Sequence, residues 1–282
     1  MTGFQKFIKY AAIAFGIYLS ITIVLVLLGI ARGFVGASKN EYRDLIKDRE
    51  EYQTEDITRT YENIKNLEID VDVTEVIIRN GDMFKIEGPG KMEIKQEGDK
   101  LKISDEKIAS SFYDENSILT IYIPDGQKMN NIDLEMNYIS ADIESLNATN
   151  LKLDTYNNYC KINELFVDNL EMNNEYGEID IYNSEVGKLK LDSESGKENV
   201  SIKILKNAEI DLEYSDTNIK LIGTQDNYQI NCKNQFGNTY IEEKEITSAT
   251  KTLGNGDVKI ELETKYTETN IDFEEKANES NL

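Results

Sequence analysis

Three aspartates in the repetitive part of the chain could do chemistry: Asp142, Asp180 and Asp211 each alternate with aliphatic neighbours. Carboxylates presented by a β-rich framework could cleave an acidic polysaccharide by general acid and base catalysis. The same alternation arises when polar residues of a strand face solvent while their neighbours face a core. We favour this second interpretation, because an anionic substrate would also need a basic cleft. The sequence therefore assigns no catalytic residue, and we expect no enzyme.

The composition excludes several other functions. The 282 residues contain no His, which is the usual general base near neutral pH and the commonest metal ligand. Catalysis by Ser-His-Asp or Cys-His sets is therefore excluded. The carboxylates lack EF-hand spacing, so the sequence assigns no metal site, and it indicates no cofactor. The net charge of −22, from 53 acidic and 31 basic residues, argues against binding to nucleic acid.

A repeat of about 19 residues organises the chain from Ile132 onward. Each unit opens with two apolar residues flanking a polar one, and these pairs begin at Ile132, Leu151, Leu170, Leu189, Ala208 and Tyr228. A second pair follows a corner and begins at Ala141, Cys160, Ile179, Val200, Thr217, Thr239 and Val258. A third apolar position recurs at Ala148, Val167, Val186 and Leu205.

This periodicity predicts an all-β fold, a β-solenoid of about seven coils stacked in sequence order. One coil alone buries too little apolar surface to offset its ordering entropy, so the coils must stack. Corners need residues that tolerate unusual backbone angles, and the expected ones are Asn158, Gly177, Gly196, Ser215, Gly237 and Gly256. A leucine-rich repeat and a β-sandwich of hairpins remain as alternatives, but neither explains a second β-type segment in a strict register.

The stacking also predicts the state of the two cysteines. Cys160 belongs to the second coil and Cys232 to the sixth. Four coils separate them by roughly 19 Å, whereas bridged cysteines need Cα atoms within about 7 Å. We expect two free, buried thiols.

Shorter strands precede the repeat. Leu67, Ile69, Val71 and Val73 alternate with acidic residues, which is typical of a half-buried strand. Further strands are expected at 76–78, 84–86, 92–94, 101–103 and 119–123, with a surface loop at 107–116. The solenoid domain is expected to span 63–265, and an acidic, disordered tail to follow at 266–282. Lys251, Glu261 and Glu263 are expected to protect the edge of the last coil.

Several stretches resemble a known family. NIKNLEIDVDVTEVIIRNGDMFKIEG (63–88) is similar to its opening, GDKLKIS (98–104) and ILTIYIPDG (118–126) to its linking strands, and YGEIDI (176–181) and NGDVKI (255–260) to its repeats. The family comprises adhesin-like domains of bacterial envelope proteins, of the DUF4097 type. The resemblance implies a β-helical solenoid, association with the cell envelope and no catalytic residues.

The N-terminal region predicts a membrane anchor. Residues 10–31 carry no charge, and a helix of that length spans roughly 33 Å. A cleaved signal peptide would have a shorter apolar core. We expect a short arm at 1–9, a single transmembrane helix at 10–31 in contact with the lipid bilayer, and a charged juxtamembrane stalk at 32–62. The large domain is expected outside the cytoplasm.

The leading hypothesis is therefore a non-enzymatic, membrane-anchored cell-envelope protein. Its solenoid would act as a binding, adhesin-like or spacing module for an unknown envelope protein or glycan. The alternatives are a scaffold whose coils stack end to end between molecules, an accessory protein of the envelope-stress response, and, least favoured, a β-helix enzyme acting on polysaccharide.

Overall fold

The chain divides into two compact units, Met1–Thr54 and Glu55–Leu282. The computed structural model describes residues 56–72, 74–105, 117–247 and 249–275, all in the second unit. The expected arm (1–9), transmembrane helix (10–31), most of the stalk and the loop at 107–116 lie outside these residues. Within the described ranges, no helix combines the length and the apolar character that crossing a bilayer requires.

The described unit consists almost wholly of strands, joined by corners and one 3-10 turn, η1 (Gln225–Asn227). The first nine strands are β1 (Ile57–Thr60), β2 (Asn66–Val71), β3 (Glu75–Gly81), β4 (Lys85–Gly88), β5 (Glu93–Glu97), β6 (Lys100–Ser104), β7 (Ile118–Pro124), β8 (Met129–Asn137) and β9 (Ser140–Ile143). The central strands are β10 (Leu146–Tyr156), β11 (Tyr159–Asn163), β12 (Leu165–Glu175), β13 (Glu178–Glu194), β14 (Lys197–Glu213) and β15 (Asp216–Ile222). The last are β16 (Tyr228–Gln235), β17 (Asn238–Ile241), β18 (Lys244–Glu245), β19 (Thr250–Leu253), β20 (Val258–Lys265) and β21 (Glu268–Glu274).

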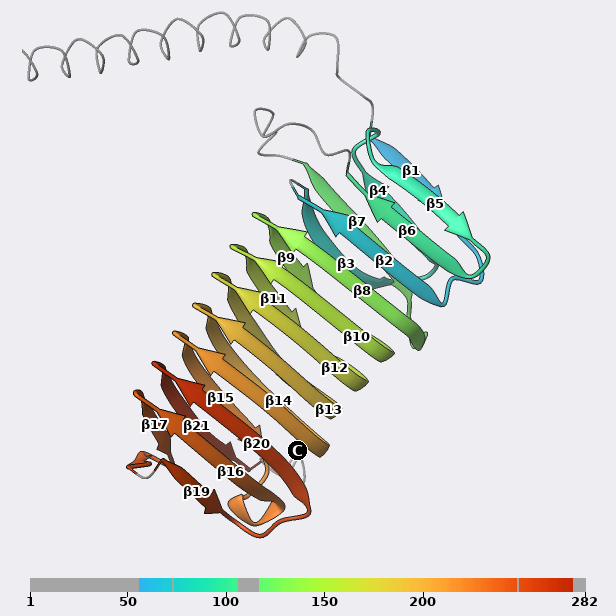
Figure 1. The fold of residues 1–282 in the computed structure, drawn as a ribbon. Helices are drawn as coiled ribbons and strands as arrows, with labels where there is room; N and C mark the ends of the chain where they lie inside the picture. Colours follow the sequence, from blue (N-terminus) through green and yellow to red (C-terminus); the bar gives the residue numbers. More distant parts are fainter. Residues whose placement is uncertain (1–55, 73, 106–116, 248, 276–282) are drawn as a thin grey trace, which may run out of the picture. The chain divides into compact units, whose positions relative to one another are not determined.

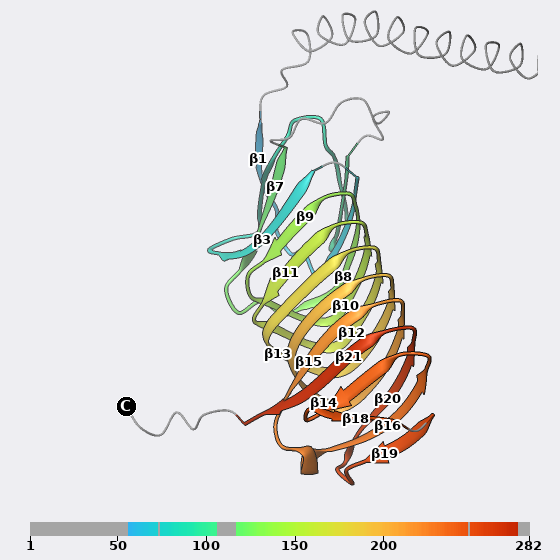
Figure 2. The same cartoon turned by 90° about the vertical axis from the view of Figure 1, so that its left-hand side faces the viewer.

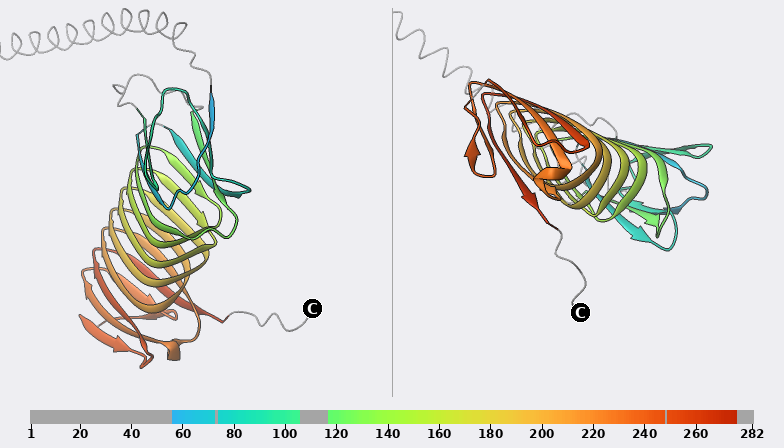
Figure 3. Two further views of the ribbon diagram at one scale, coloured as in Figure 1. Left: turned by 90° about the vertical axis from the view of Figure 1, so that its right-hand side faces the viewer. Right: turned by 90° about the horizontal axis from the view of Figure 1, so that it is seen from below.

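These strands form a β-solenoid with two long faces (Figure 1). Face A consists of parallel strands in the stacking order β6, β2, β8, β10, β12, the second half of β13, the second half of β14, β20 and β16. Face B consists of β7, β3, β9, β11, the first halves of β13 and β14, β15, β21 and β17. The view in Figure 3 shows the coils stacked along one axis.

The core confirms the predicted ladder. Leu151, Leu170 and Leu189 are register partners, and each is at most 2% exposed. This parallel ladder excludes a β-sandwich of hairpins, and the second parallel ladder through β9, β11 and β13 excludes a leucine-rich repeat. All the short strands expected before the repeat are present as β2 to β7.

The third apolar position is confirmed in three coils and wrong in the fourth. Ala148, Val167 and Val186 are buried, but Leu205 is 45% exposed and Ile204 is buried in its place. The physical reason is a register shift between β13 and β14, which pairs Val186 with Ile204. The spacing from one coil to the next therefore changes within the repeat.

The C-terminal coils are not stacked in sequence order, which corrects the prediction. The strand after β14 on face A is β20, and β16 lies beyond it. On face B, β21 lies between β15 and β17 in the same way. The last coil in the sequence is thus inserted between two coils that precede it. Figure 1 shows β15, β21 and β17 in this order, and Figure 2 shows β20 next to β16. Glu261 and Glu263 of β20 therefore lie inside the stack instead of protecting its edge.

The N-terminal end is also out of order. β2 lies between β6 and β8, and β3 lies between β7 and β9, although both β2 and β3 precede these strands in sequence. Each face has nine strands, so the solenoid has nine coils instead of about seven. The two additional coils are formed by β2 with β3 and β6 with β7. Antiparallel strands cover both ends: β5 and β4 with β1 at one, and β19 and β18 at the other.

The solenoid also exceeds the expected domain limits of 63 and 265. β1 begins at Ile57, and β21 continues to Glu274, with Thr269 and Ile271 buried. Residues 268–274 are therefore a strand, not the start of a disordered tail. Cys160 and Cys232 are free and buried, as predicted. Burial raises the pKa of the Cys160 thiol to about 12 and that of Cys232 to about 11.

The corners between faces A and B differ from the prediction by one residue. The left-handed conformation lies at Asn157, Tyr176, Ser195, Tyr214 and Phe236, with φ between 50° and 59°, immediately before the expected positions. Gly177 and Gly196 serve another purpose. A Cβ at Gly177 would lie 2.5 Å from the Asn174 side chain, so the glycines leave room for buried polar side chains. Gly256 does not occupy this corner, which in its coil is formed by Tyr266.

Candidate functional site

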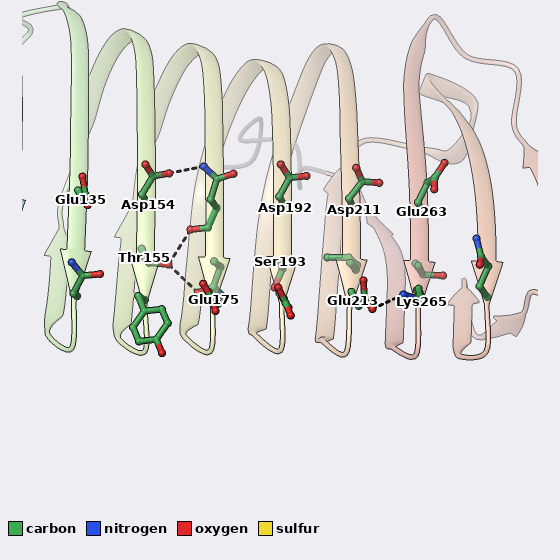
Figure 4. Close-up of a pocket in the computed structure, with 18 residues that line it drawn as sticks. Glu135, Asp154, Thr155, Glu175, Asp192, Ser193, Asp211, Glu213, Glu263 and Lys265 are labelled. Carbon is green, nitrogen blue, oxygen red and sulfur yellow. Dashed lines mark hydrogen bonds and ion pairs between the residues drawn. The ribbon is translucent and has the colours of Figure 1, made fainter.

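A groove runs along the outer surface of face A, beside the corners (Figure 4). It has a volume of about 660 Å³ and crosses β8, β10, β12, β13, β14, β20 and β16. Neighbouring parallel strands lie about 4.8 Å apart, so the groove is roughly 29 Å long. Its length along the stack suits an extended ligand better than a compact one.

Two rows of side chains line the groove, one residue per strand. Register pairing aligns the first row as Glu135, Asp154, Asn173, Asp192, Asp211 and Glu263. It aligns the second row as Asn137, Tyr156, Glu175, Glu194, Glu213, Lys265 and Gln235. These rows exist because alternate residues of a strand face outward and the parallel register repeats them on each coil.

Lysines neutralise part of this acidic lining. Lys190 lies 2.9 Å from Asp192, and Lys265 lies 2.5 Å from Glu213. Asp154 forms an ion pair with Lys152, and Glu263 forms one with Lys233 at 2.8 Å. Among the described residues, no salt bridge reaches four other carboxylates of the lining: Glu135, Glu175, Glu194 and Asp211. The groove is therefore acidic.

Asp211 shows the effect of this crowding. Partial burial raises the pKa of its carboxyl group, and the nearby charges of Asp192, Glu263 and Glu209 raise it further. Glu263 comes from the inserted strand β20, next to Asp211 in register. A cation in the groove would relieve this repulsion, which gives the groove an electrostatic preference for positively charged ligands.

Aromatic side chains follow the corners along one edge of the groove, and all of them except the half-buried Tyr156 are exposed. We call this set the aromatic ridge: Tyr138, Tyr156, Tyr176, Tyr214, Tyr266 and Phe236. The first three rings meet edge to face, with centroids 5.2 and 5.8 Å apart. The last three are stacked, with centroids 5.1 and 5.2 Å apart. The Ser195 corner separates the two groups.

A buried polar cluster lies beneath the same corners. Glu198 is fully buried, and its carboxyl group accepts hydrogen bonds from Asn174 at 2.6 Å, Ser193 at 2.5 Å and Thr217 at 2.7 Å. These partners come from neighbouring coils, so the cluster ties the coils together inside the corner. Buried polar groups are tolerated only when they are hydrogen-bonded in this way. Asn174 and Ser193 also line the groove, and their hydrogen bonds to Glu198 hold these two side chains in place.

The structure does not bring the three candidate aspartates together. Asp142 and Asp180 lie in one column of face B, with Lys161 between them in register, whereas Asp211 lies on face A. Asp180 is 8% exposed and accepts hydrogen bonds from Tyr159 at 2.9 Å and Asn199 at 2.8 Å. The hydrogen bond to Asp180 raises the pKa of Tyr159 to about 12. These contacts hold Asp180 as a structural residue.

The described residues also contain no cluster of three or more carboxylates or thiols that could hold a metal ion. Of the groove residues, sequence reasoning singled out Asp211 as a candidate and missed the aromatic ridge. A signal was present, because Tyr138, Tyr176 and Tyr214 recur two repeats apart, and Tyr176 and Tyr214 each precede an expected corner residue. The left-handed residue of each corner is the tyrosine itself.

The fold defines the chain as a β-solenoid protein with capped ends and an acidic groove along one face. The chain belongs to the Toastrack DUF4097 family, whose model matches residues 53–281. This confirms the resemblance drawn from the short motifs. No curated protein matches the chain.

Several solved structures match this chain at low sequence identity. A "putative adhesin" from Bacteroides fragilis shares 12% identity over 78% of this chain and 97% of its own, with a TM-score of 0.40. A "putative lipid binding protein" from Parabacteroides distasonis shares 14% over 77% and 97%, with a TM-score of 0.41. A "putative cell adhesion protein" from Clostridium sporogenes shares 9% over 79% and 100%, with a TM-score of 0.31. Likenesses of this size transfer no function to this chain.

Proposed function

We propose that this chain is a non-enzymatic binding module of the cell envelope and that the groove on face A is its binding surface. The observation that supports this most directly is the groove itself, which offers a continuous acidic lining on rigid strands across seven coils. Binding sites are typically concave surfaces with convergent polar groups on a stiff framework. Asp211 lies on the other face from Asp142 and Asp180, and Asp180 is buried and held by hydrogen bonds from Tyr159 and Asn199, which favours binding over catalysis.

The proposal includes the membrane anchor at 10–31, because that stretch carries no charge and suits a bilayer in length. The large domain would then face the envelope, outside the cytoplasm. Protease treatment of intact cells tests this topology. Cleavage of the large domain is expected, and its complete protection would contradict the proposal.

The ends of the solenoid argue against an end-to-end scaffold. Continued stacking between molecules would need open parallel strands at both ends, but the outermost strands are antiparallel: β1 and β5 at one end and β18 and β19 at the other. Short, charged or covered edge strands disfavour such pairing. A spacing or binding role therefore fits better than self-assembly.

Sedimentation of the full chain, in nonionic detergent, with envelope fragments of the producing cells tests the groove. The variant Glu175→Gln, Glu194→Gln, Asp211→Asn removes three of its charges without breaking a lysine pair. The control Asp142→Asn, Asp216→Asn, Glu268→Gln removes the same charge from face B. We expect at least a tenfold loss of binding for the groove variant and little change for the control. Equal behaviour of the two variants would refute the groove as the binding surface.

A further inference from the structure

Five residues of the aromatic ridge adopt a backbone conformation that costs free energy for bulky side chains. Tyr138, Tyr176, Tyr214, Tyr266 and Phe236 all have φ between 54° and 59°, in the left-handed region that suits glycine and asparagine but disfavours bulky residues. Their side chains are also 44–79% exposed, so burial recovers little of that cost. Asn157 and Ser195 form the same corner without an aromatic side chain, so the fold does not require one there.

Strained residues retained at the surface point to function, since a cheaper residue would build the corner equally well. The ridge is also an exposed apolar strip on an otherwise charged molecule, and such strips mark interaction surfaces. Phe236, at the end of the row, is 79% exposed. We therefore expect the ridge to be covered by a binding partner.

The charges beside the ridge select the partner. In sequence, Glu175 precedes Tyr176 and Glu213 precedes Tyr214, while Glu194 precedes the Ser195 corner between them. Glu175 and Glu194 carry no salt bridge within the described part of the chain, and Lys190 offsets only part of the repulsion that Asp192, Glu263 and Glu209 exert on Asp211. A ligand lying on the ridge thus meets negative charge along its length and must itself be basic.

The packing of the rings distinguishes a polypeptide from a glycan. A sugar ring packs flat against an aromatic face, but Tyr214, Tyr266 and Phe236 stack on one another with interplanar angles of 5° and 14°. Each of these three rings therefore has at least one face covered by another ring. Lysine and arginine can instead lay their apolar stems along such a stack while the charged ends reach nearby carboxylates.

We propose that the aromatic ridge and the acidic groove together dock an extended, basic polypeptide segment. This inference rests on the proposed function and names the partner of that surface. An extended segment of about nine residues covers the roughly 29 Å of the groove at about 3.3 Å per residue. Its positive side chains meet the carboxylate rows, and its apolar stems cover the tyrosines. Tyrosine and arginine contacts of this kind dominate many protein interfaces.

A binding titration with a fluorescent ten-residue oligolysine tests the inference on the full chain in nonionic detergent. The test variant is Tyr214→Asn with Tyr266→Asn, because asparagine suits the left-handed backbone and the corner should keep its shape. The control is Phe166→Asn, which removes an exposed aromatic side chain outside the ridge. Neutral chitooligosaccharide and Ca²⁺ serve as alternative ligands. Thermal unfolding of each variant checks the fold.

We expect the unchanged chain to bind oligolysine with an affinity that weakens as salt is added. The double variant should lose at least tenfold in affinity while its Tm stays unchanged or rises. Phe166→Asn should keep the affinity of the unchanged chain. Equal affinity in the double variant would overturn the inference, because general attraction to a chain of net charge −22 would then explain the binding. Tighter binding of the oligosaccharide or of Ca²⁺ would also overturn it. If oligolysine fails to bind while the groove charges still govern sedimentation with envelope fragments, the proposed function stands and only the basic polypeptide is refuted.

Discussion

The middle of the solenoid and its two ends use the same strand pairs but follow different ordering rules. In the middle, β8, β10, β12, β13 and β14 succeed one another along the axis as they do along the chain. At each end, one coil lies between two other coils, and one of these two is not its neighbour in sequence. A local repeat is therefore enough to set the register of a coil, whereas the order of the coils depends on contacts distant in sequence.

The test with the largest expected effect removes the inserted coil, which consists of β20 and β21. A chain ending at Asp257 lacks β20 and β21, together with the buried residues Ile260, Leu262 and Ile271. We expect β16 to β19 to detach and unfold, because their only parallel partners are β20 and β21. Limited proteolysis should then cleave between residues 224 and 257.

A matched deletion in the middle provides the control. Removal of 151–169 joins Asn150 to Leu170 and preserves every column, because these residues make up one repeat. We expect this shorter chain to fold cooperatively and to resist protease. If the chain ending at Asp257 were equally resistant around β16, the inserted coil would not be needed and the contrast between middle and ends would fail.

A second test compares the polar interiors of the two regions. Glu198→Ala removes the acceptor of three buried hydrogen bonds in the middle coils and should cost roughly 4 kcal/mol of unfolding free energy. Thr269→Ala, in the inserted coil, removes one hydroxyl contact with Thr267 and should cost about 1 kcal/mol. Urea denaturation measures both, with Glu198→Gln as a control that keeps the side-chain volume. Equal costs for the two alanine variants would show that the interior is uniform.

A third test addresses the irregular step within the middle. Ile204→Ala should cost about 3 kcal/mol, because it leaves a cavity in the core column that continues from Val186. Leu205→Ala should change the unfolding free energy by less than about 0.5 kcal/mol, because that side chain is exposed. The reverse ranking in urea denaturation would mean that the strict repeat, and not the shifted register, describes this coil.

The smallest effect reports on the coil order itself. Insertion of β20 places Glu263 beside Asp211, and the two charges help to hold the pKa of Asp211 above its ordinary value. Glu263→Gln should therefore lower that pKa, measured by NMR titration of the Asp211 carboxyl group. An unchanged pKa would argue that β20 does not lie beside β14.

The same shift has a consequence for stability. A carboxyl group whose pKa is raised in the folded state destabilises the fold when it is ionised, so stability rises as pH falls through that pKa. Asp211→Asn should remove this dependence and stabilise the protein at pH 7 by no more than about 0.5 kcal/mol. Thermal unfolding across pH 4–7 checks the sign; a stabilisation that grew toward acid in the variant would contradict it.

These contrasts explain what the sequence could and could not predict. The columns through Leu151, Leu170 and Leu189 follow from an apolar pattern that each coil repeats, so the solenoid, its core and the free cysteines were predictable. The insertion of β20 was not, because the repeat assigned Val258 to the second strand of its coil, whereas the structure pairs Ile260 with both Ala208 and Ile230 on face A. The apolar pattern of one coil does not reveal which coils will lie beside it.

The functional surface shows the same division. The acidic rows were visible as polar residues alternating with the core, although their meaning depends on which coils are adjacent. The aromatic ridge was hidden because left-handed corners are expected at glycine and asparagine, and here Tyr176 and Tyr214 adopt that conformation. Gly177, which follows Tyr176, instead leaves room for the Asn174 side chain.

The placement of β20 and β21 also bears on how the chain is made. During synthesis, β16 to β19 leave the ribosome before the strands that will lie beneath them, so this end must stay open until residues 258–274 arrive. Residues 258–274 then fill the place between β14 and β16 on face A and between β15 and β17 on face B. This end can therefore complete its folding only after β21 has been made. A ribosome stalled before that point would expose unpaired strand edges and apolar surface, which chaperones can bind.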